Sequence, residues 1–415
     1  VSTTIVGLTD GRHSVVVTVK DAAQNSVSSA PISFVFDNNN TLTVGPVVGP
    51  SPLADFNNIP EAISKATAGD AIHVAAGSYG DSLTVNKALN IQGGVGGGTS
   101  TQTAAVMITA DNVTLNHFTF TGNLGSNAFI NVDNDIAHSG VSITNNTFNG
   151  AITTWHVIRV GGSKTNISIT GNTFTGSTSG NDNALIYLGV AGSNINVLNN
   201  SFGAFPSTYS IFVIQHNASG GARTTNMAIN NNNINFTGYA NGSGAEGISV
   251  RYADDVQVNG NTLTGSATDA IYEAGITLAS VISTNGSAVN NNIVSGFSQN
   301  IRILRWSVGQ GFTNGVNITG NTLTNGVLTG GVSRGTGLYL AGTNLLIQNN
   351  EFSGNANQGI FIPLADPAGT NDITGTLVSN NKIFSNSSFG VRNLLPSVLN
   401  ASPNWWGNVT GPLHS

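Results

Sequence analysis

ISITGNTFTG (167–176) combines alternating apolar and polar residues with a turn-forming asparagine and a phenylalanine, and closely similar stretches recur along the chain. VSITNNTFNG (141–150) precedes it, while VQVNGNTLTG (256–265) and VNITGNTLTN (316–325) follow. Alternation of apolar and polar residues with a period of two is typical of β-strands. Each stretch therefore predicts a strand, a turn at the asparagine, and a buried residue after the turn.

The asparagine recurs at nearly constant spacing. The pattern Asn-x-hydrophobe begins at Asn116, Asn146, Asn172, Asn200, Asn232, Asn261, Asn291, Asn321, Asn350 and Asn381. The intervals are 30, 26, 28, 32, 29, 30, 30, 29 and 31 residues, which indicates repeated structural units rather than separate domains. No unit leaves room for a helix between its strands, so the pattern excludes a fold of alternating strands and helices.

A parallel β-helix explains this repeat, because like positions of successive coils then stack about 4.8 Å apart. One column is predicted to be apolar and buried: Phe118, Phe148, Phe174, Phe202, Ile234, Leu263, Ile293, Leu323, Phe352 and Ile383. The asparagines form a turn column, since asparagine tolerates left-handed backbone angles and stacked amides can hydrogen-bond. The alternative, that they are N-glycosylation acceptors, is weaker because stacking already explains them.

From about residue 53 onward the chain resembles the right-handed parallel β-helix of the pectin-lyase-like superfamily. The resemblance implies 11–12 coils and, at the usual strand spacing, a rod about 55 Å long. That superfamily is rich in polysaccharide lyases and hydrolases. Their catalytic patterns are a Lys or Arg base with carboxylate-bound calcium, or clustered acids with a Gly-His-Gly motif, and neither carries a residue over to this sequence.

The ends of the chain predict further units. Residues 1–37 resemble the last strands of a bacterial immunoglobulin-like domain, 38–52 form a Gly/Pro-rich linker, and 53–415 form the β-helix. Within it, 58–67 are expected to form a capping helix that begins at Asn58, with Pro60 in the first turn and Glu61 in a capping box. PNWWGNVTGP (403–412) resembles the segment that closes such arrays. We expect the parent polypeptide to be longer.

Composition narrows the possible partners. The net charge is −6, only 8% of residues are charged and no basic cluster occurs, so nucleic acid and anionic membrane surfaces are not expected partners. No apolar run approaches the roughly 18–20 residues of a membrane span. Cysteine is absent, and asparagine makes up about one residue in seven. This composition resembles secreted bacterial surface proteins, which predicts an extracellular or cell-surface location.

Carboxylates are the candidates for catalysis. Glu246 and Glu273 precede equivalent second strands of adjacent coils, so their expected separation matches the roughly 5–5.5 Å of a retaining glycosidase pair, with Asp269 nearby. The alternative is a solvated turn, which we favour. Asp254 and Asp255 occupy a turn position and are interpreted as structural.

Metal and histidine chemistry are less well supported. Residues 133–135 (Asp-Asn-Asp) offer hard oxygens to calcium, but two carboxylates without a third do not establish a site, so no cofactor is predicted. His156 and His216 stand singly on separate coils and are interpreted as surface or turn residues.

The second strand of each coil supplies the candidate binding face. If Ile248 and Val250 point inward, Arg and aromatic residues of neighbouring coils point outward together. The predicted ligand-binding residues are Arg159, Tyr187, Phe212, Arg251, Tyr252, Arg302, Arg305, Trp306, Tyr339 and Phe361. Aromatic rings stack on sugars and arginine binds carboxylates, so this face is expected to be partly exposed and to bind ligand. The alternative is a register slip, or covering loops, that buries the aromatics.

Two functions fit these observations. The leading hypothesis is a non-enzymatic extracellular module that acts as a rigid spacer and touches glycan or a neighbouring subunit through this face. The second hypothesis is a polysaccharide lyase or glycoside hydrolase that uses the same face as its substrate groove.

Overall fold

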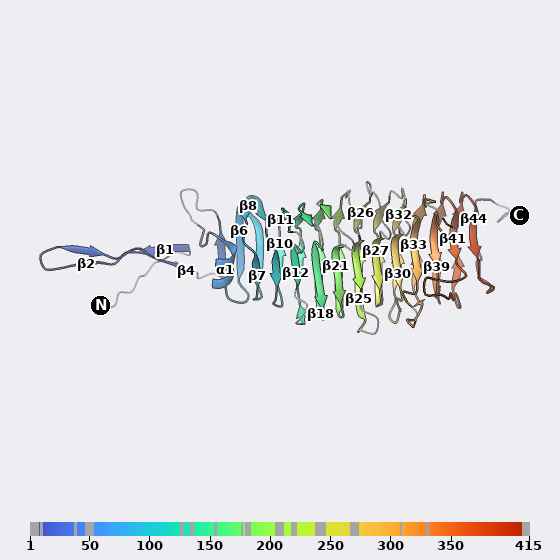
Figure 1. The fold of residues 1–415 in the computed structure, drawn as a ribbon, viewed down its shortest axis with the longest axis horizontal. Helices are drawn as coiled ribbons and strands as arrows, with labels where there is room; N and C mark the ends of the chain where they lie inside the picture. The colour runs from blue at the N-terminus through green and yellow to red at the C-terminus, as the bar shows by residue number, and fades with distance from the viewer. Residues whose placement is uncertain are drawn as a thin grey trace.

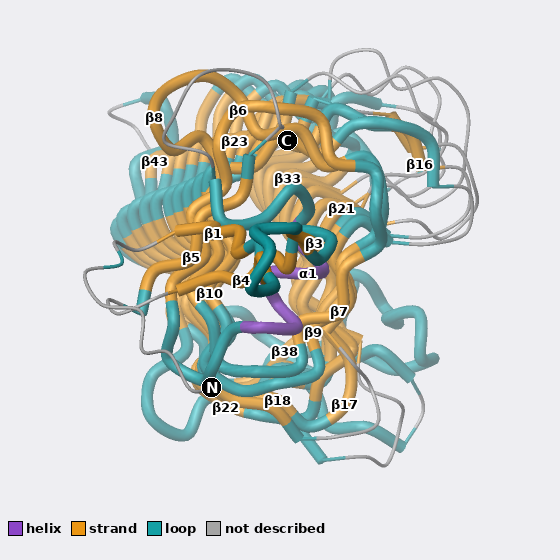
Figure 2. Tube along the Cα trace, turned by 90° about the vertical axis from the view of Figure 1, so that its left-hand side faces the viewer, coloured by secondary structure: helices purple, strands orange, loops and turns teal. Residues whose placement is uncertain are grey.

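The chain forms a parallel β-helix, seen in a computed structural model (Figure 1). The structure describes residues 8, 11–36, 40–45, 54–124, 128–132, 137–152, 156–175, 177–178, 184–203, 211–216, 222–236, 246–265, 274–307, 309–328, 331 and 333–408. The coils stack along one axis, and viewed along that axis they superpose around a shared interior (Figure 2). The described part of the chain contains no helix long and apolar enough to cross a membrane.

One wall of the rod is a parallel sheet of twelve strands, one from each coil. In chain order these are β7 (Leu83–Val85), β9 (Val106–Ile108), β12 (Ile130–Val132), β17 (Ile158–Gly162), β21 (Ala184–Val190), β24 (Ile211–His216), β27 (Glu246–Arg251), β30 (Ala274–Ala279), β33 (Gln299–Leu304), β37 (Thr336–Leu340), β41 (Gln358–Ile362) and β44 (Phe389–Asn393). We call it the twelve-stranded sheet.

The remaining wall comes from the repeated motif, whose turn separates two strands in most coils. The strands before the turn are β5 (Thr41–Val44), β10 (Thr114–Asn116), β13 (His138–Ser139), β14 (Ser142–Thr144), β18 (Lys164–Thr170), β22 (Ser193–Leu198), β25 (Thr224–Asn230), β28 (Ala253–Asn259), β31 (Ala288–Asn290), β35 (Asn317–Thr319), β39 (Leu346–Gln348) and β42 (Leu377–Ser379). In the first coils β6 (Ala71–Tyr79) and β8 (Asn90–Gln102) run through both positions. Those after it are β11 (Phe118–Phe120), β15 (Thr147–Phe148), β19 (Thr173–Phe174), β23 (Ser201–Phe202), β26 (Asn233–Asn235), β29 (Thr262–Thr264), β32 (Ile293–Ser295), β36 (Thr322–Thr324), β40 (Glu351–Ser353) and β43 (Lys382–Phe384). Two short parallel pairs, β16 (Ala151–Ile152) with β20 (Ser177–Thr178) and β34 (Thr313–Asn314) with β38 (Gly342–Thr343), lie in the connections.

The predicted phenylalanine column is confirmed. The rings of Phe148 and Phe174 stack with centroids 4.9 Å apart, and those of Phe174 and Phe202 stack at 4.6 Å. All three side chains are buried. Stacked aromatic rings of this kind add to the stabilisation that burial alone provides.

The predicted asparagine column is confirmed as a hydrogen-bonded ladder of stacked amides, and it is buried. At each step the Oδ1 atom accepts hydrogen bonds from the main-chain N–H and the Nδ2 of the preceding ladder asparagine, as Asn200 does from Asn172 at 2.9 and 3.0 Å. The Nδ2 atom also donates to a main-chain carbonyl of the preceding coil, as Asn200 does to Ile169 at 2.9 Å. The left-handed backbone falls on the residue before the ladder asparagine, for example Asn145 or Gly171.

The structure corrects the predicted columns at two coils. In the coil of β10 and β11, Phe118 rather than Asn116 occupies the ladder position, where its N–H donates to Asn146 Oδ1 at 2.9 Å. Phe120 rather than Phe118 therefore stacks on Phe148, at 4.9 Å. In another, Asn292 rather than Asn291 joins the ladder. Consequently Val294 is buried in the column, and Ile293 is 52% exposed.

Helix α1 (Ile59–Lys65) covers the first coil, where a capping helix was expected. Asn58 caps it by accepting a hydrogen bond from the Glu61 N–H at 2.8 Å, and Pro60 lies in the first turn. Ile59, Ala62 and Ile63 are buried against the interior. Viewed along the rod, α1 lies across the end of the stack (Figure 2).

The region before α1 differs from the expectation. Strands β1 (Gly11–Val15) and β4 (Ile32–Phe36) pair antiparallel, as do β2 (Thr18–Lys20) and β3 (Ser26–Ser28), so the described residues form a long hairpin that projects from the rod (Figure 1). An immunoglobulin-like sandwich is not shown. The predicted linker 38–52 contains β5, which pairs with β6, so the β-helix begins before residue 53.

At the other end, the Asn-Trp-Trp-Gly segment continues the motif. Asn404 completes the ladder by accepting hydrogen bonds from the N–H and Nδ2 of Asn381, at 2.9 and 3.0 Å. Trp405 pairs with Lys382 in an isolated bridge. Residues 409–412 of the predicted closing segment lie outside the described residues.

Candidate functional site

The outer face of the twelve-stranded sheet carries a single row of residues, one from each coil. Strand register aligns Thr84, Met107, Asn131, Arg159, Tyr187, Ile214, Ser249, Thr277, Arg302, Tyr339, Phe361 and Arg392. The sequence predicted most of this alignment. Phe212 is not in the row, because Ile214 pairs with both Tyr187 and Ser249. The side chain of Phe212 lies outside the described part of the structure.

The first half of this face is open. Thr84, Met107, Asn131, Arg159 and Tyr187, which we call the open row, are exposed or half-buried. A groove of about 150 Å³ runs along β7, β9 and β12 and is lined by Thr84, Met107 and Asn131. Arg159 lies beside it and donates from Nη1 to Asn131 Oδ1 at 3.3 Å. The groove therefore has a mixed polar and apolar lining, with a guanidinium beside it.

His156 and Tyr187 form an aromatic pair at the end of the open row. Their rings stack with centroids 4.3 Å apart, and His156 Nδ1 accepts a hydrogen bond from the Ala184 N–H at 3.1 Å. Burial lowers the pKa of His156 to about 4, so the imidazole is neutral at neutral pH. His156 was predicted to be a surface or turn residue; it lies outside the strands and is half-buried, and the sequence did not show which ring lies opposite it.

Tyr187 also depends on a glycine two residues later. Its ring crosses Gly189 so closely that a Cβ on Gly189 would lie 2.6 Å from the tyrosine ring. The ring therefore lies flat over the sheet, beside Arg159, its register neighbour on β17.

The middle of the face is an ion-pair cluster. Glu246 is 1% exposed and accepts a hydrogen bond from Arg251 Nη2 at 2.8 Å, another from Arg302 Nη2, and one from Thr277 Oγ1 at 3.1 Å. The carboxylate thus links β27, β30 and β33. Two cations and a hydroxyl occupy its oxygens, so Glu246 is positioned as a structural clamp rather than as a free acid or base.

Two cation–π contacts flank this cluster. The Arg251 guanidinium lies over the Trp306 ring, 3.8 Å from its centroid, and Trp306 is 36% exposed. Arg223 lies over the Tyr252 ring at 4.3 Å and donates to Asp254 Oδ1 at 2.6 Å. Asp255 has the left-handed backbone expected of its turn position. Trp306 is exposed and Tyr252 is half-buried, so the rings of both remain accessible to a ligand.

The face is covered at β37 and β41, which contradicts the predicted exposure of Tyr339 and Phe361. Tyr339 and Phe361 are 7% and 2% exposed and pack with Ala279, Leu304 and Ala341 in a second apolar cluster outside the sheet. Burial raises the pKa of Tyr339 to about 12, so its phenol is neutral, and burial lowers the pKa of Arg302 to about 10, so its guanidinium is still charged at neutral pH.

Arg305 ties the covering loops together. It lies over the Phe312 ring at 4.6 Å and pairs with the buried Asp366 at 3.4 Å. Its Nη2 atom also donates to the Ala368 carbonyl at 3.1 Å and to Thr370 Oγ1 at 2.7 Å. Because Asp366, Ala368 and Thr370 lie more than sixty residues further along the chain, these contacts could not be foreseen from local sequence.

Several predicted residues cannot be placed. Glu273, Asp269 and residues 133–135 lie outside the described residues, as does the side chain of His216. The proposed pairing of Glu246 with Glu273 therefore stays a prediction. Within the described ranges, no group of three or more histidine and acidic residues could hold a metal ion.

Comparison with known proteins returns distant matches of fold. No known protein family and no curated protein matches the sequence. Solved structures that match include the periplasmic alginate epimerase AlgG, with 12% identity over 81% of this chain and 76% of that chain, and a TM-score of 0.39. The Azotobacter vinelandii mannuronan C-5 epimerase AlgE4 A-module shares 14% identity over 83% of this chain and 94% of that one, with a TM-score of 0.41.

A family PL6 polysaccharide lyase from Pseudopedobacter saltans shares 14% identity over 77% of this chain and 90% of its own, with a TM-score of 0.32. These neighbours are parallel β-helix polysaccharide epimerases and lyases. At such identities the likeness concerns the fold alone.

Proposed function

We propose that this chain is an extracytoplasmic β-helix module that contacts glycan through the open row. The observation that carries the proposal is the row itself: five aligned side chains on successive coils, next to a groove and ending in Arg159 and Tyr187. A linear polymer lying along the rod would meet one of these side chains on each coil. The low charge and the high Asn, Gly and Thr content resemble those of secreted bacterial proteins, which fits a location outside the cytoplasm.

The groups in the open row match the chemistry of sugars. Arg159 can bind a carboxylate or hydroxyl, Asn131 offers an amide, and Tyr187 presents a ring edge and a hydroxyl. The second half of the face suits this role less well, because Glu246 takes up hydrogen bonds of Arg251 and Arg302 and Tyr339 is buried. Trp306, exposed beside Arg251, is the further contact that we expect there.

A glycan array followed by calorimetry tests the proposal. We expect binding to an acidic or neutral polysaccharide, weakened about tenfold or more by Arg159→Ala or Tyr187→Ala. The part due to Arg159 should fall with added salt, whereas the part due to Tyr187 should not. Tyr339→Phe, which changes a buried residue, and Lys382→Met, which removes an exposed cation elsewhere, serve as controls. No binding on the array, or equal binding by all four variants, would contradict the proposal.

A second candidate is an enzyme that modifies a polysaccharide at the same face. The observation that favours it is His156, a histidine kept neutral beside Tyr187 of the open row, because acid–base chemistry needs a titratable group close to the bound substrate. Incubation with acidic and neutral polysaccharides, followed by NMR of the products, separates the two functions. Bond cleavage or epimerisation that disappears in His156→Gln supports the enzyme, and binding without turnover supports the module.

A further inference from the structure

The groove of the open row continues past β7 to the capped end of the rod. A second hollow of about 370 Å³ lies between β7 and α1, and it shares Ser82 and Thr84 with the groove along β7, β9 and β12. We call it the cap hollow, and its other lining residues are Pro60, Ile63, Ser64, Asn86 and Lys87. A glycan that follows the open row would therefore continue across β7 and end against α1.

Alternation along β7 turns three uncharged hydrogen-bonding side chains outward. Ser82, Thr84 and Asn86 are exposed, while Leu83 and Val85 between them are buried. None of the three outward side chains forms a hydrogen bond with another residue that the structure describes. Such hydroxyl and amide groups can both donate to and accept from the hydroxyls of a sugar. The cap hollow therefore matches an uncharged, hydroxyl-rich ligand.

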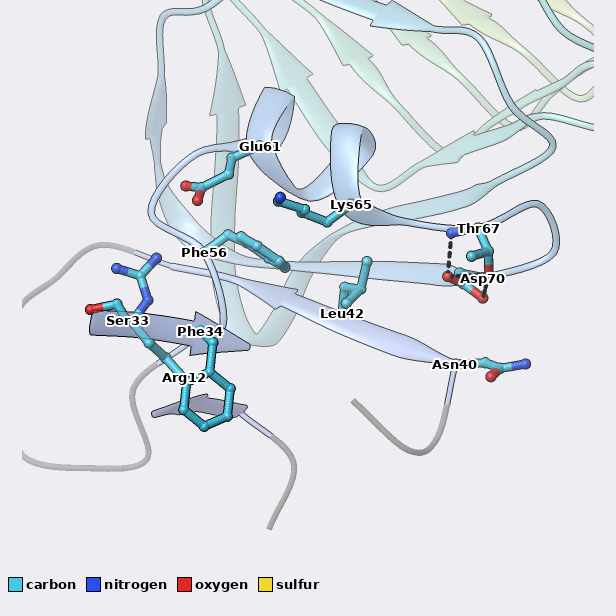
Figure 3. A pocket seen from close by; sticks show the side chains of 10 residues that line it. All are labelled: Arg12, Ser33, Phe34, Asn40, Leu42, Phe56, Glu61, Lys65, Thr67 and Asp70. Carbon is cyan, nitrogen blue, oxygen red and sulfur yellow. Dashed lines mark hydrogen bonds between the residues drawn. The ribbon is translucent and has the colours of Figure 1, made fainter. Parts of the chain in front are cut away.

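The charges around the cap hollow do not favour an acidic sugar. Lys87, the one charged residue among the described residues that line it, donates from Nζ to three carbonyls at the end of α1 at 2.7–2.9 Å. Asp81, the residue before Ser82, is exposed and adds a negative charge. The charged side chains of α1 itself, Glu61 and Lys65, line a separate cleft beside the hairpin (Figure 3). A carboxylate in the cap hollow would therefore meet an ammonium that is already hydrogen-bonded and a nearby acid.

Arg159 is too far from the cap hollow to compensate such a carboxylate. It lies three strands from β7, because β9 and β12 separate β17 from β7. At a strand spacing of about 4.8 Å this separation is about 14 Å, which exceeds the Debye length of about 8–10 Å at physiological ionic strength. An acidic sugar beside Arg159 lies next to a guanidinium, whereas an acidic sugar at β7 loses water without gaining a cation.

We propose that the glycan bound by the open row is a heteropolymer, with an acidic sugar at Arg159 and neutral sugars at the cap hollow. The inference rests on the glycan contact proposed above and adds the residues that distinguish one polymer from another. Ser82, Thr84 and Asn86 hydrogen-bond the neutral units. A polymer with a carboxylate on every unit places unpaired charges at the cap hollow, where their loss of hydration is not compensated. The cap hollow is therefore the specificity-determining end of the site.

Calorimetry of the whole chain with three β-1,4-linked hexasaccharides tests the inference. The probes are cellohexaose, cellohexaose with one terminal unit oxidised to glucuronate (each end isomer in turn), and the hexamer oxidised to glucuronate at every unit. The better singly oxidised isomer should bind about tenfold more tightly than either of the others, and Arg159→Ala should reduce its affinity to that of cellohexaose.

Two results would overturn the inference, and they differ in what they say of the glycan contact. Equal or tighter binding of the fully oxidised hexamer would overturn it while the glycan contact at the open row stands. Absence of binding by all the hexamers would also overturn it, and the glycan array then decides on the glycan contact by itself.

Asn86 gives the sharper test, because its side chain is exposed and can be changed without disturbing the core. Asn86→Lys supplies the missing cation, so the fully oxidised hexamer should bind it several-fold more tightly than it binds the wild type. Asn86→Ala should weaken the singly oxidised hexamer several-fold, because hydrogen bonds to a neutral unit are lost. Asn317→Lys, which adds the same charge at an exposed asparagine of β35, is the matched control. Equal responses of Asn86→Lys and Asn317→Lys would refute the role of the cap hollow.

Discussion

Asn232 joins three coils through one buried amide. Its Oδ1 accepts from the N–H and Nδ2 of Asn200 at 2.9 and 3.0 Å, and its Nδ2 donates to Val197 O and Asn261 Oδ1 at 2.9 and 3.0 Å. Asn232→Ala should lower the free energy of unfolding by roughly 3–5 kcal/mol, since each buried group left without a partner costs about 1–3 kcal/mol. Urea unfolding measures the loss. Asn317→Ala, an exposed asparagine on β35, should cost far less, and equal costs would show that the ladder contributes little.

At the same scale, alternation predicted the phenylalanine column but not every register. Phe148, Phe174 and Phe202 stand alone between polar neighbours, so only one face can be buried. At 290–294 three asparagines precede two apolar residues, and local sequence is consistent with burying either Ile293 or Val294. Val294 is the buried residue because it stacks between Leu263 and Leu323 of the neighbouring coils. These two residues lie about thirty positions away in the sequence, so local sequence could not predict the choice.

His156 makes stability depend on pH. Its pKa is about 4 when folded, because burial disfavours the charged ring, against a reference value of 6.5. The contribution is therefore complete above pH 6.5 and is lost as the pH falls towards 4. Between pH 7.5 and pH 5 the wild type should lose about 2 kcal/mol that His156→Gln does not lose. Urea unfolding of both proteins at the two pH values checks this, and parallel losses would contradict it.

At the scale of single elements, α1 shows what local sequence can and cannot supply. Asn58, Pro60 and Glu61 predicted its start. Lys87, which lies outside the helix, completes its end: Nζ donates to the carbonyls of Ile63, Ser64 and Ala66 at 2.9, 2.9 and 2.7 Å. This contact could not be predicted, because it forms only when the next coil folds beneath the helix.

Lys87→Met should consequently loosen the cap. Three hydrogen bonds from a charged donor to the carbonyl end of a helix are lost, and we expect a loss of about 1–3 kcal/mol. Hydrogen exchange should show faster exchange in α1 than in the central coils. Lys382→Met, which removes an exposed lysine from β43, is the matched control and should leave α1 protected. Unchanged exchange in Lys87→Met would mean that burial of Ile59 and Ile63 alone holds the cap.

The outer face gives the complementary lesson. Period-two alternation was sufficient to align Arg159, Tyr187, Arg302 and Tyr339, since one register satisfies the interior. The alignment did not predict which of these side chains are exposed. Exposure depends on loops and ion pairs from distant segments, and alternation within a strand carries no information on these contacts. Tyr339 is buried against Leu304 and Phe361 of neighbouring coils, while the coils that carry Arg159 and Tyr187 leave their outer face open.

For the whole molecule, the position of β5 predicts where the rod begins. The hairpin of residues 11–36 touches the rod through few contacts, such as Arg12 with Asp55, and its valines at 17, 19 and 27 are exposed. Strand β5, in contrast, pairs with β6, and its Leu42 and Val44 are buried in the core. Deleting residues 1–36 should therefore leave the thermal unfolding temperature (Tm) of the rod nearly unchanged. Deleting residues 1–45 should lower Tm by several degrees, because the buried side chains of β5 are lost as well. In a chain of this size each kcal/mol of lost stability shifts Tm by roughly 2–4 °C or less. Calorimetry of the two truncated proteins beside the full chain distinguishes the boundaries. If both deletions lowered Tm equally, the hairpin would belong to the cooperatively folding unit. If neither deletion lowered Tm, the first coil would begin at β6 rather than β5.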